Sequence, residues 1–231
     1  MPMAKTALIT GAGQGMGRGV ARQLARAGHR VLVNDIDGDR AETAAAGICG
    51  AGGDAIAAAF DITDTEQALA AIAALNEAHG GIDILVNNAG NAGAGHMPQM
   101  SFRDMPPSEW DKYIAVNLYG VLNCTKAVVD GMCERGWGRI VVISSEAGRS
   151  GLDIGVSIYG AAKAAGAHFM RHLAREVGPQ GVTANVISLG LMNNVPEEFT
   201  SSLVRGIPVR RLGSSDDVAH AVNYLVADEA A

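Results

Sequence analysis

The sequence has little charge, few aromatic residues and almost no cysteine. Of its 231 residues, 18% are charged and 4% are aromatic, and the formal net charge is −6. Because no run of basic residues occurs, a nucleic acid is not expected as a partner. The three cysteines are scattered and odd in number, so they predict neither a disulfide framework nor a cysteine-rich metal site, and they fit a reducing cytoplasm.

Long apolar runs and a secretion signal are missing as well. No stretch approaches the roughly 18 apolar residues that span a bilayer, and no charged segment with a cleavage site precedes the first apolar run. We therefore expect no membrane partner and a cytoplasmic location. What the chain does have is 48% hydrophobic residues and 30 glycines, which suit a large core with close helix–sheet packing.

Short apolar runs alternate with helix-like segments along the chain. The runs are continuously apolar, which is typical of strands buried on both faces of a parallel sheet. Strands are predicted at 6–10, 30–35, 55–61, 82–86, 139–145 and 182–188. Helices are predicted from the glycine-rich turn to about residue 28, and at about 39–50, 65–79, 108–135, 157–178 and 216–227.

This alternation predicts an α/β fold, a doubly wound parallel sheet (Rossmann fold) in a single domain over residues 1–231. Right-handed crossovers give the strand order 3-2-1-4-5-6. The carboxyl ends of the strands then meet at one edge of the sheet, where Asp35, Asn88 and Ser145 fall. Residues 191–213 are irregular and contain two prolines, and we expect them to form a substrate lid or a small lobe.

Four glycines follow the first predicted strand and precede a helix. Gly11, Gly13, Gly15 and Gly17 let the backbone approach a pyrophosphate at the helix N-terminus, where free N–H groups favour anions. A tight turn without a ligand is the alternative. The strand before the turn, the helix after it and the acid at Asp35 together favour a dinucleotide site.

Asp35 ends the second predicted strand, 20 residues after Gly15. A carboxylate at this place can accept hydrogen bonds from both hydroxyl groups of an adenosine ribose, and it repels a 2′-phosphate. Neither Gln14 nor Ile36, which could hold such a phosphate, is basic, so the sequence favours NAD over NADP. Asp61, after the third strand, could accept a hydrogen bond from the adenine amino group or belong to the start of the next helix.

Tyr159 and Lys163 lie four residues apart on a predicted helix, so their side chains share one face. An ammonium group beside a phenol favours the phenolate and lowers its pKa, which is about 10 in a free side chain. Such a pair can act as a base. The alternative is a surface tyrosine that packs on the lysine stem.

Asn117 lies inside the long predicted helix, where its side chain competes with the backbone for hydrogen bonds, which hints at a function. The alternative is an exposed helix asparagine.

Five motifs occur in an order that resembles the short-chain dehydrogenase/reductase family, in its simple single-domain form and closest to its 3-oxoacyl-carrier-protein reductase-like branch. The five together cover most of the chain and are specific, although each alone would be weak. They are Thr10-Gly11-Ala12-Gly13-Gln14-Gly15-Met16-Gly17, Asn87-Asn88-Ala89-Gly90, Asn117 in Val116-Asn117-Leu118-Tyr119-Gly120, Ser145 in Ile143-Ser144-Ser145, and Tyr159 with Lys163.

The resemblance implies an oxidoreductase that transfers a hydride between NAD(H) and a secondary alcohol or ketone. Tyr159 would be the general acid and base, and Lys163 would bind the nicotinamide ribose and lower the pKa of the phenol. Ser145 would orient the substrate oxygen about 3 Å from the phenol, with Ser144 as the competing candidate. Asn117 would hold a water that links Lys163 to solvent.

The resemblance also implies where the cofactor would be bound, at the carboxyl ends of the predicted strands. Besides Tyr159 and Lys163, the cofactor-binding residues would be Gly11, Gly13, Gln14, Gly15, Met16, Gly17, Asp35, Ile36, Asp61, Ile62, Asn88, Ala89, Gly90, Gly190, Met192 and Asn194.

The chain departs from the family pattern in three places. Ser145 and Tyr159 are 14 residues apart, which implies one inserted residue in the loop between them. Leu189-Gly190 stands in place of a Pro-Gly pair, and Asn194 in place of a threonine that contacts a phosphate. The family's seventh strand is not found in this sequence, which would leave the sixth strand as an open edge.

Two other functions remain open. The enzyme could be an NADPH-dependent 3-oxoacyl reductase, or the chain could be a nucleotide-binding regulator without activity. The resemblance implies a homodimer or homotetramer, formed through the helices at about 108–135 and 157–178. No motif identifies the alcohol or ketone substrate.

Two further patterns are not expected to carry the chemistry. His168 and His172 share a helix face, but no third ligand accompanies them, so no metal is expected. Met97, Met100 and Met105 are expected to pad an apolar pocket wall.

Overall fold

The computed structural model describes residues 4–90, 99–194 and 197–230. Six parallel strands form one sheet in the order β3-β2-β1-β4-β5-β6, which confirms the predicted doubly wound α/β fold. Their observed ends differ from the predicted ends by at most two residues. The strands are β1 (Thr6–Ile9), β2 (Arg30–Asp35), β3 (Asp54–Ala59), β4 (Ile84–Asn87), β5 (Gly138–Ser145) and β6 (Val182–Leu189).

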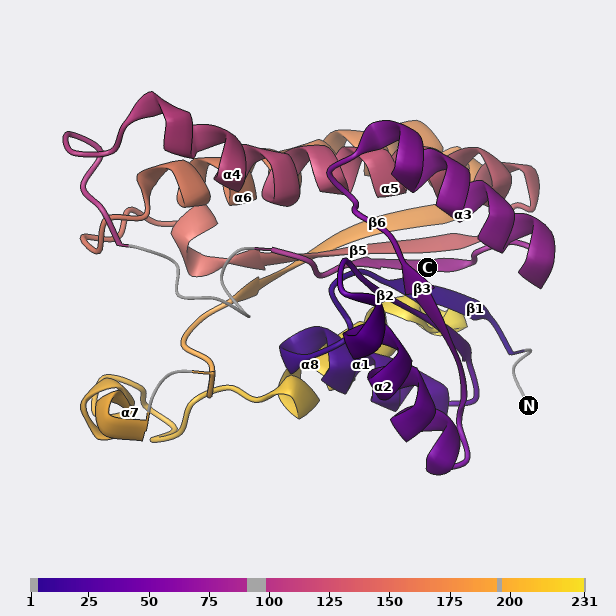
Figure 1. Ribbon diagram of the computed structural model, residues 1–231, viewed down its shortest axis with the longest axis horizontal. Helices are drawn as coiled ribbons and strands as arrows, with labels where there is room; N and C mark the ends of the chain where they lie inside the picture. The colour runs from indigo at the N-terminus through magenta and orange to yellow at the C-terminus, as the bar shows by residue number, and fades with distance from the viewer. Residues whose placement is uncertain (1–3, 91–98, 195–196, 231) are drawn as a thin grey trace.

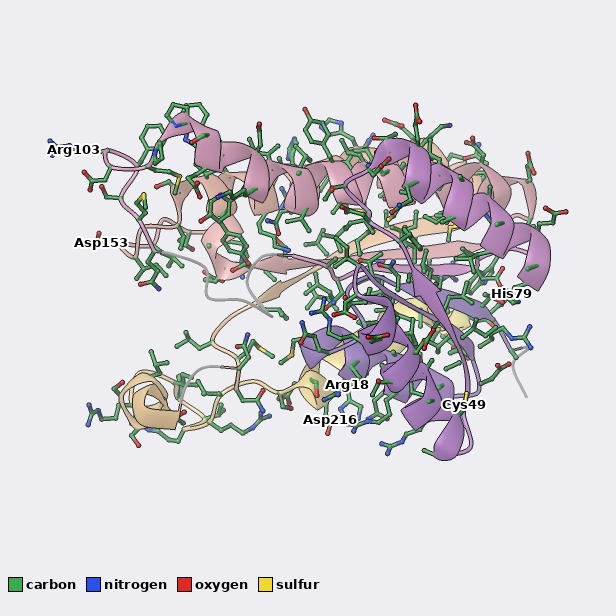
Figure 2. The ribbon with its side chains drawn as sticks, viewed as in Figure 1. Arg18, Cys49, His79, Arg103, Asp153 and Asp216 are labelled. Carbon is green, nitrogen blue, oxygen red and sulfur yellow. The ribbon has the colours of Figure 1, made fainter. Side chains whose placement is uncertain are left out.

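Helices cover both faces of the sheet (Figure 1). One face carries α1 (Gly15–Arg26), α2 (Gly38–Gly50) and α8 (Ser215–Val226). The other face carries α3 (Thr65–His79), α4 (Trp110–Ile114), α5 (Gly120–Glu134) and α6 (Ser157–Val177). Figure 2 shows the two ends of this layered body: Arg103 and Asp153 lie at the end to which the strands point, and Cys49 and His79 at the opposite end.

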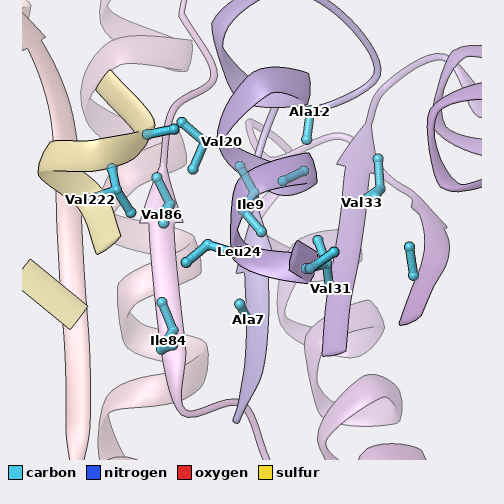
Figure 3. Packing of buried hydrophobic residues seen from close by; sticks show 14 of the residues in the cluster. Ala7, Ile9, Ala12, Val20, Leu24, Val31, Val33, Ile84, Val86 and Val222 are labelled. Carbon is cyan, nitrogen blue, oxygen red and sulfur yellow. The ribbon is translucent and has the colours of Figure 1, made fainter. Parts of the chain in front are cut away.

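Successive residues of each central strand enter different cores. In β1, Ile9 packs against α1 and α8, whereas Leu8 packs on the side of α5 and α6. In β2, Val31 and Val33 join the first core and Leu32 the second. Figure 3 shows the first core between the sheet and the helices. Because both faces of the strand are buried, both sets of alternating positions must be apolar, which explains the continuous apolar runs.

β6 forms one edge of the sheet within the described residues. Only Val182 is buried among its eight residues, whereas seven of the eight residues of β5 are buried. The open edge that the sequence predicted for the sixth strand is therefore present in the described part of the chain.

The helix predicted at about 108–135 is divided into several parts. A 3-10 turn (Pro107–Glu109) leads into α4, and a π-helical turn (Ala115–Tyr119) separates α4 from α5. A π turn inserts one extra residue into the helix and occurs frequently at functional sites. Here it contains Asn117.

The segment predicted as irregular at 191–213 contains a short helix, α7 (Glu197–Val204). Its two ends are joined: the Asn193 N–H donates to the Gly213 carbonyl at 2.8 Å, and the Gly213 N–H donates to the Leu191 carbonyl at 3.0 Å. The segment therefore leaves the body of the protein and returns to it at a single place, and α7 lies apart from the sheet (Figure 1).

Candidate active site

The turns after β1 and β4 are locked together. The Thr10 hydroxyl accepts hydrogen bonds from the N–H groups of Asn88 and Ala89, both at 3.0 Å. The Asn88 amide donates to the carbonyls of Thr10 at 2.8 Å and Gly11 at 3.1 Å. Gly11 has φ +61°, and a Cβ there would lie 2.9 Å from Ala89 Cα, so only glycine fits. The predicted residues Gly11, Asn88 and Ala89 thus lie together at this edge, joined by the Asn88 side chain, the Thr10 hydroxyl and the close approach of Gly11 to Ala89.

The N-terminus of α1 is not capped by any side chain. Gln14 at the N-cap makes no side-chain hydrogen bond to the helix, and the first turn contains no acidic residue. By contrast, Asp37, Asp64 and Ser214 cap α2, α3 and α8. The free N–H groups and positive dipole end of α1, beside the predicted residues Gly15, Met16 and Gly17, suit the pyrophosphate of a dinucleotide.

Asp35 at the end of β2 is only 4% exposed. Its Oδ2 accepts a hydrogen bond from the Gly13 N–H at 3.1 Å, and its Oδ1 accepts one from the Asp37 N–H at 3.1 Å. The Arg40 guanidinium donates to the same Oδ1 from Nε at 3.2 Å and from Nη2 at 2.7 Å. Arg40 is not among the site residues that the sequence predicted. The available signal was a basic residue five positions after the acid.

Asp61 and Ile62 follow β3 at the same edge of the sheet. Asp61 Oδ1 accepts hydrogen bonds from the N–H and the hydroxyl of Thr63, both at 2.8 Å, while Asp64 caps α3. Ile62 is buried beside Gly120, and Ile36 is 66% exposed next to Asp35. The half-buried Asp61 and the exposed Ile36 could therefore flank an adenine, with Ile62 as their support.

Ser145 and Tyr159 come together where β5 ends and α6 begins. A side-chain hydrogen bond joins them. The neighbouring Ser144 is buried and donates instead to the Lys163 carbonyl at 3.3 Å. Of the two candidate serines, Ser145 is therefore the one that contacts the phenol.

Lys163 and Asn117 lie near this pair. The Lys163 ammonium is 5.9 Å from the centre of the Tyr159 ring and donates to the Ile143 carbonyl at 2.9 Å. A Cβ on Gly90 would lie 2.8 Å from Asn117 Oδ1 and 3.0 Å from Lys163 Nζ. The structure therefore brings all four predicted catalytic residues together, with the predicted Gly90 against them.

Asn117 is buried, not exposed, with 1% of its surface accessible. Its amide donates to the Tyr113 carbonyl at 2.9 Å. The π turn around Asn117 alters the local backbone, and the Asn117 carbonyl oxygen faces Gly166 of α6, where a Cβ would approach it to 3.3 Å. This placement beside α6 suits a residue that acts together with Lys163.

Burial shifts the pKa of both titratable residues of the site. It raises the pKa of Tyr159, and the hydrogen bond from Ser145 opposes this shift. It lowers the pKa of Lys163 to about 8. The sequence predicted a lowered pKa for Tyr159. In the protein alone the direction is opposite, because burial disfavours the phenolate and Lys163 donates to a carbonyl 2.9 Å away instead of to the phenol.

Gly190, Met192 and Asn194 leave the same edge of the sheet after β6. Gly190 and Asn194 are exposed, whereas Met192 packs against the core between the sheet, α1 and α8. Met192 also pairs with Gly213 in an isolated bridge. The predicted contacts of this segment with a nicotinamide thus fall next to the joined ends of residues 191–213.

The methionines and histidines singled out in the sequence lie in two places. Met100 and Met105 belong to an apolar cluster that includes Tyr159, while Met97 lies outside the described residues. His168 and His172 lie on the exposed face of α6, with their Nε2 atoms 3.2 Å apart. Within residues 4–90, 99–194 and 197–230, no group of three or more His, Cys, Asp or Glu residues could hold a metal ion.

None of the helices in these described ranges has the length and apolar character needed to span a bilayer.

Residues 5–199 match the family model described as short chain dehydrogenase. The chain is 37% identical over 238 residues to "Oxidoreductase UcpA" of Escherichia coli (strain K12), a match that covers 97% of this chain and 88% of the relative. It is 35% identical over 234 residues to an "Acetoacetyl-CoA reductase" of Allochromatium vinosum, covering 98% of this chain and 93% of that protein.

A similar solved structure is that of an NAD⁺-bound xylitol dehydrogenase. The two structures agree with a TM-score of 0.89 at 26% sequence identity, over 97% of this chain and 93% of the other.

Proposed function

The chain belongs to the short-chain dehydrogenase family and is a pyridine-nucleotide-dependent oxidoreductase, and from this premise we propose that it transfers a hydride between NAD(H) and a secondary alcohol or ketone. The observation that supports this most strongly is the arrangement at the start of α6. There a buried Tyr159 shares a hydrogen bond with Ser145, and the Lys163 ammonium lies 5.9 Å from the phenol ring centre.

The residues at the edge of the sheet fit a dinucleotide. The free N–H groups of α1 suit its pyrophosphate, and the carboxylate of Asp35 suits an adenosine ribose. When bound, the nicotinamide supplies or accepts the hydride. Lys163 and Asn117 lie where they could hold the second ribose and a water, respectively, with Gly90 packed against both.

Tyr159 handles the proton of the reaction in this proposal. In reduction, its hydroxyl gives a proton to the substrate oxygen while the carbonyl carbon receives the hydride; in oxidation, the phenolate takes that proton back. Ser145 donates a hydrogen bond to the same oxygen, and the Lys163 ammonium stabilises the phenolate. Burial raises the pKa of Tyr159, so in the oxidative direction the phenolate needs the nearby Lys163 ammonium to stabilise it.

Asp35 supports NAD as the preferred cofactor, because its carboxylate repels a 2′-phosphate. A second candidate function is an NADPH-dependent reductase of 3-oxoacyl thioesters. Arg40, 2.7 Å from Asp35, favours that candidate, as does the similarity to a protein named acetoacetyl-CoA reductase.

The substrate would lie against an apolar wall beside Tyr159. Met105, Tyr113 and Val156 are buried together with it, and Met100 and Trp110 pack on this cluster. We propose a single-domain, cytoplasmic homo-oligomer (a dimer or tetramer) in which residues 191–213 act as the substrate lid.

Replacing Tyr159 with Phe tests this function. We expect turnover of NAD(H) or NADP(H) with a panel of 3-oxoacyl thioesters, hydroxyacyl compounds and sugar alcohols to fall about 10²–10⁴-fold, while nucleotide binding measured by calorimetry is unchanged. Tyr224→Phe, at a tyrosine that is 72% exposed on α8, is the matched control and should keep full activity.

Two results would contradict the proposal. Turnover by the Tyr159→Phe protein at the wild-type rate would remove the role given to the phenol. Nucleotide binding by the wild-type protein without turnover of any substrate would favour the non-catalytic regulator.

A further inference from the structure

The carboxylate of Asp35 already has most of its hydrogen-bonding capacity in use. A carboxylate offers about four lone-pair positions. Three donors meet Oδ1, from the Asp37 N–H and two Arg40 nitrogens, and the Gly13 N–H meets Oδ2. Little capacity therefore remains for two ribose hydroxyl groups, although the carboxylate is at the end of β2 where a ribose would lie.

The donor that could leave is Arg40. The Gly13 and Asp37 donors belong to the backbone of tight turns, so they are fixed in place. The Arg40 side chain stands in the first turn of α2 and is 38% exposed, and its Nη1 lies 3.6 Å from Asp37 Oδ2. Its guanidinium is therefore anchored by carboxylates on one side and is open to solvent on the other.

We propose that Arg40 is a specificity-determining residue, which offsets the charge of Asp35 and lets the site accept a 2′-phosphate as well as free ribose hydroxyls. This inference rests on the proposed nucleotide-dependent function. A guanidinium binds phosphate and carboxylate oxygens with the same planar set of donors. Arg40 can thus exchange part of its contact with Asp35 for a phosphate placed beside it, whereas an isolated Asp35 would only repel that group.

A purely structural role for Arg40 makes a different prediction. If Arg40 only held Asp35 in its orientation, its removal would weaken binding of every adenine dinucleotide to a similar extent. If Arg40 supplies the counter-charge, its removal weakens binding of NADP⁺ alone and leaves a carboxylate with free lone pairs for NAD⁺.

The experiment compares NAD⁺ and NADP⁺, which differ only in the 2′-phosphate, by calorimetric titration of the full chain. In Arg40→Gln we expect the affinity for NADP⁺ to fall about 10- to 100-fold, the range of a lost hydrogen bond to a charged group. The affinity for NAD⁺ should stay the same or rise. Arg40→Lys keeps the charge and should recover part of the NADP⁺ affinity.

Replacing the other member of the ion pair should act in the opposite direction. In Asp35→Asn the repulsion is gone and Arg40 is released, so we expect the NADP⁺ affinity to rise about tenfold and the NAD⁺ affinity to fall. Arg30→Gln is the matched control, because Arg30 pairs with Asp54 at 2.8 Å on the exposed surface at the other end of β2. It should leave both affinities unchanged.

Three outcomes separate the inference from the function on which it rests. Equal losses of NAD⁺ and NADP⁺ affinity in Arg40→Gln would show a structural role and overturn the inference while the proposed function stands. Unchanged affinities in Arg40→Gln would overturn it as well. A wild-type protein that binds neither nucleotide would overturn the proposed function itself.

Discussion

Two buried charges lie on the carboxyl side of the sheet, and their surroundings differ: Asp35 where β2 ends (the nucleotide end) and Lys163 on α6 beside β5 (the catalytic end). Asp35, 4% exposed, has the Arg40 guanidinium 2.7 Å away and two backbone donors besides. Lys163, 6% exposed, donates to the carbonyl of Ile143, and within the described ranges no carboxylate forms an ion pair with it.

This difference separates binding from catalysis. A counter-charge and hydrogen bonds compensate a buried charge for the water that it has lost, which suits a residue that binds a ligand. A buried charge without a counter-charge titrates more easily: the pKa of Lys163 falls to about 8. Groups whose pKa moves toward neutrality are typical of catalytic sites. The buried carboxylate at the nucleotide end thus has a counter-charge. The buried ammonium at the catalytic end has none within the described ranges, so its burial lowers the stability of the folded protein.

Replacing Lys163 with Met should change the pH dependence of stability more than any other substitution proposed here. Lysine has a pKa of 10.5 in the unfolded chain and about 8 in the folded protein. Between these values the unfolded chain binds more protons, so stability should rise with pH from about 8 to 10.5, by about 3 kcal/mol in total. In Lys163→Met this rise of stability with pH should be absent.

Urea unfolding at a series of pH values measures this rise, taken as the difference between wild type and variant. Lys126→Met is the matched control, because Lys126 lies exposed on α5 in an ion pair with Asp130, and it should follow the wild-type curve. If the Lys163→Met and wild-type curves run parallel between pH 8 and 10.5, the ammonium is not buried at a cost.

Replacing Asn34 with Ala, next to Asp35, should lower the stability by a smaller amount that does not depend on pH. The buried Asn34 amide donates to the carbonyls of Ala58 and Phe60, both at 3.0 Å. Its loss leaves two buried carbonyls unpaired, so we expect a loss of about 2 kcal/mol in unfolding free energy, equal at pH 7 and pH 10.

The control for this variant is Asn185→Ala on the half-exposed strand β6, where the amide donates a long hydrogen bond to the Thr183 hydroxyl at 3.4 Å. It should cost less than about 0.5 kcal/mol. If the loss of unfolding free energy in Asn34→Ala changed with pH as strongly as the effect of Lys163→Met, the proposed electrostatic difference between the two ends would be wrong.

The fold could be predicted because its signals are local and repeated. In β1 and β2, continuous apolar runs such as Leu8–Ile9 and Val31–Val33 identify doubly buried strands. The pair Tyr159 and Lys163 could be placed on one side of α6 because the helical period alone fixes their relative position.

The remaining features depend on contacts that neither the helical period nor the strand period can predict. The Arg40–Asp35 pair crosses the turn from β2 to α2, and its separation of five residues matches neither a strand nor a helix face. The π turn at Asn117 has no residue-level signature. The direction of the Tyr159 pKa shift depends on how deeply the phenol is buried, which only the packed structure gives.

NMR of ¹³C-labelled protein can follow the titration of each lysine side chain and so measure whether Lys163 is a buried ammonium without a counter-charge. The chain has four lysines. We expect one lysine signal to titrate near pH 8 and to be missing from the spectrum of Lys163→Met. If no lysine signal titrates below about pH 10, burial does not lower the pKa of Lys163. The proposed electrostatic difference between the surroundings of Asp35 and of Lys163 is then wrong.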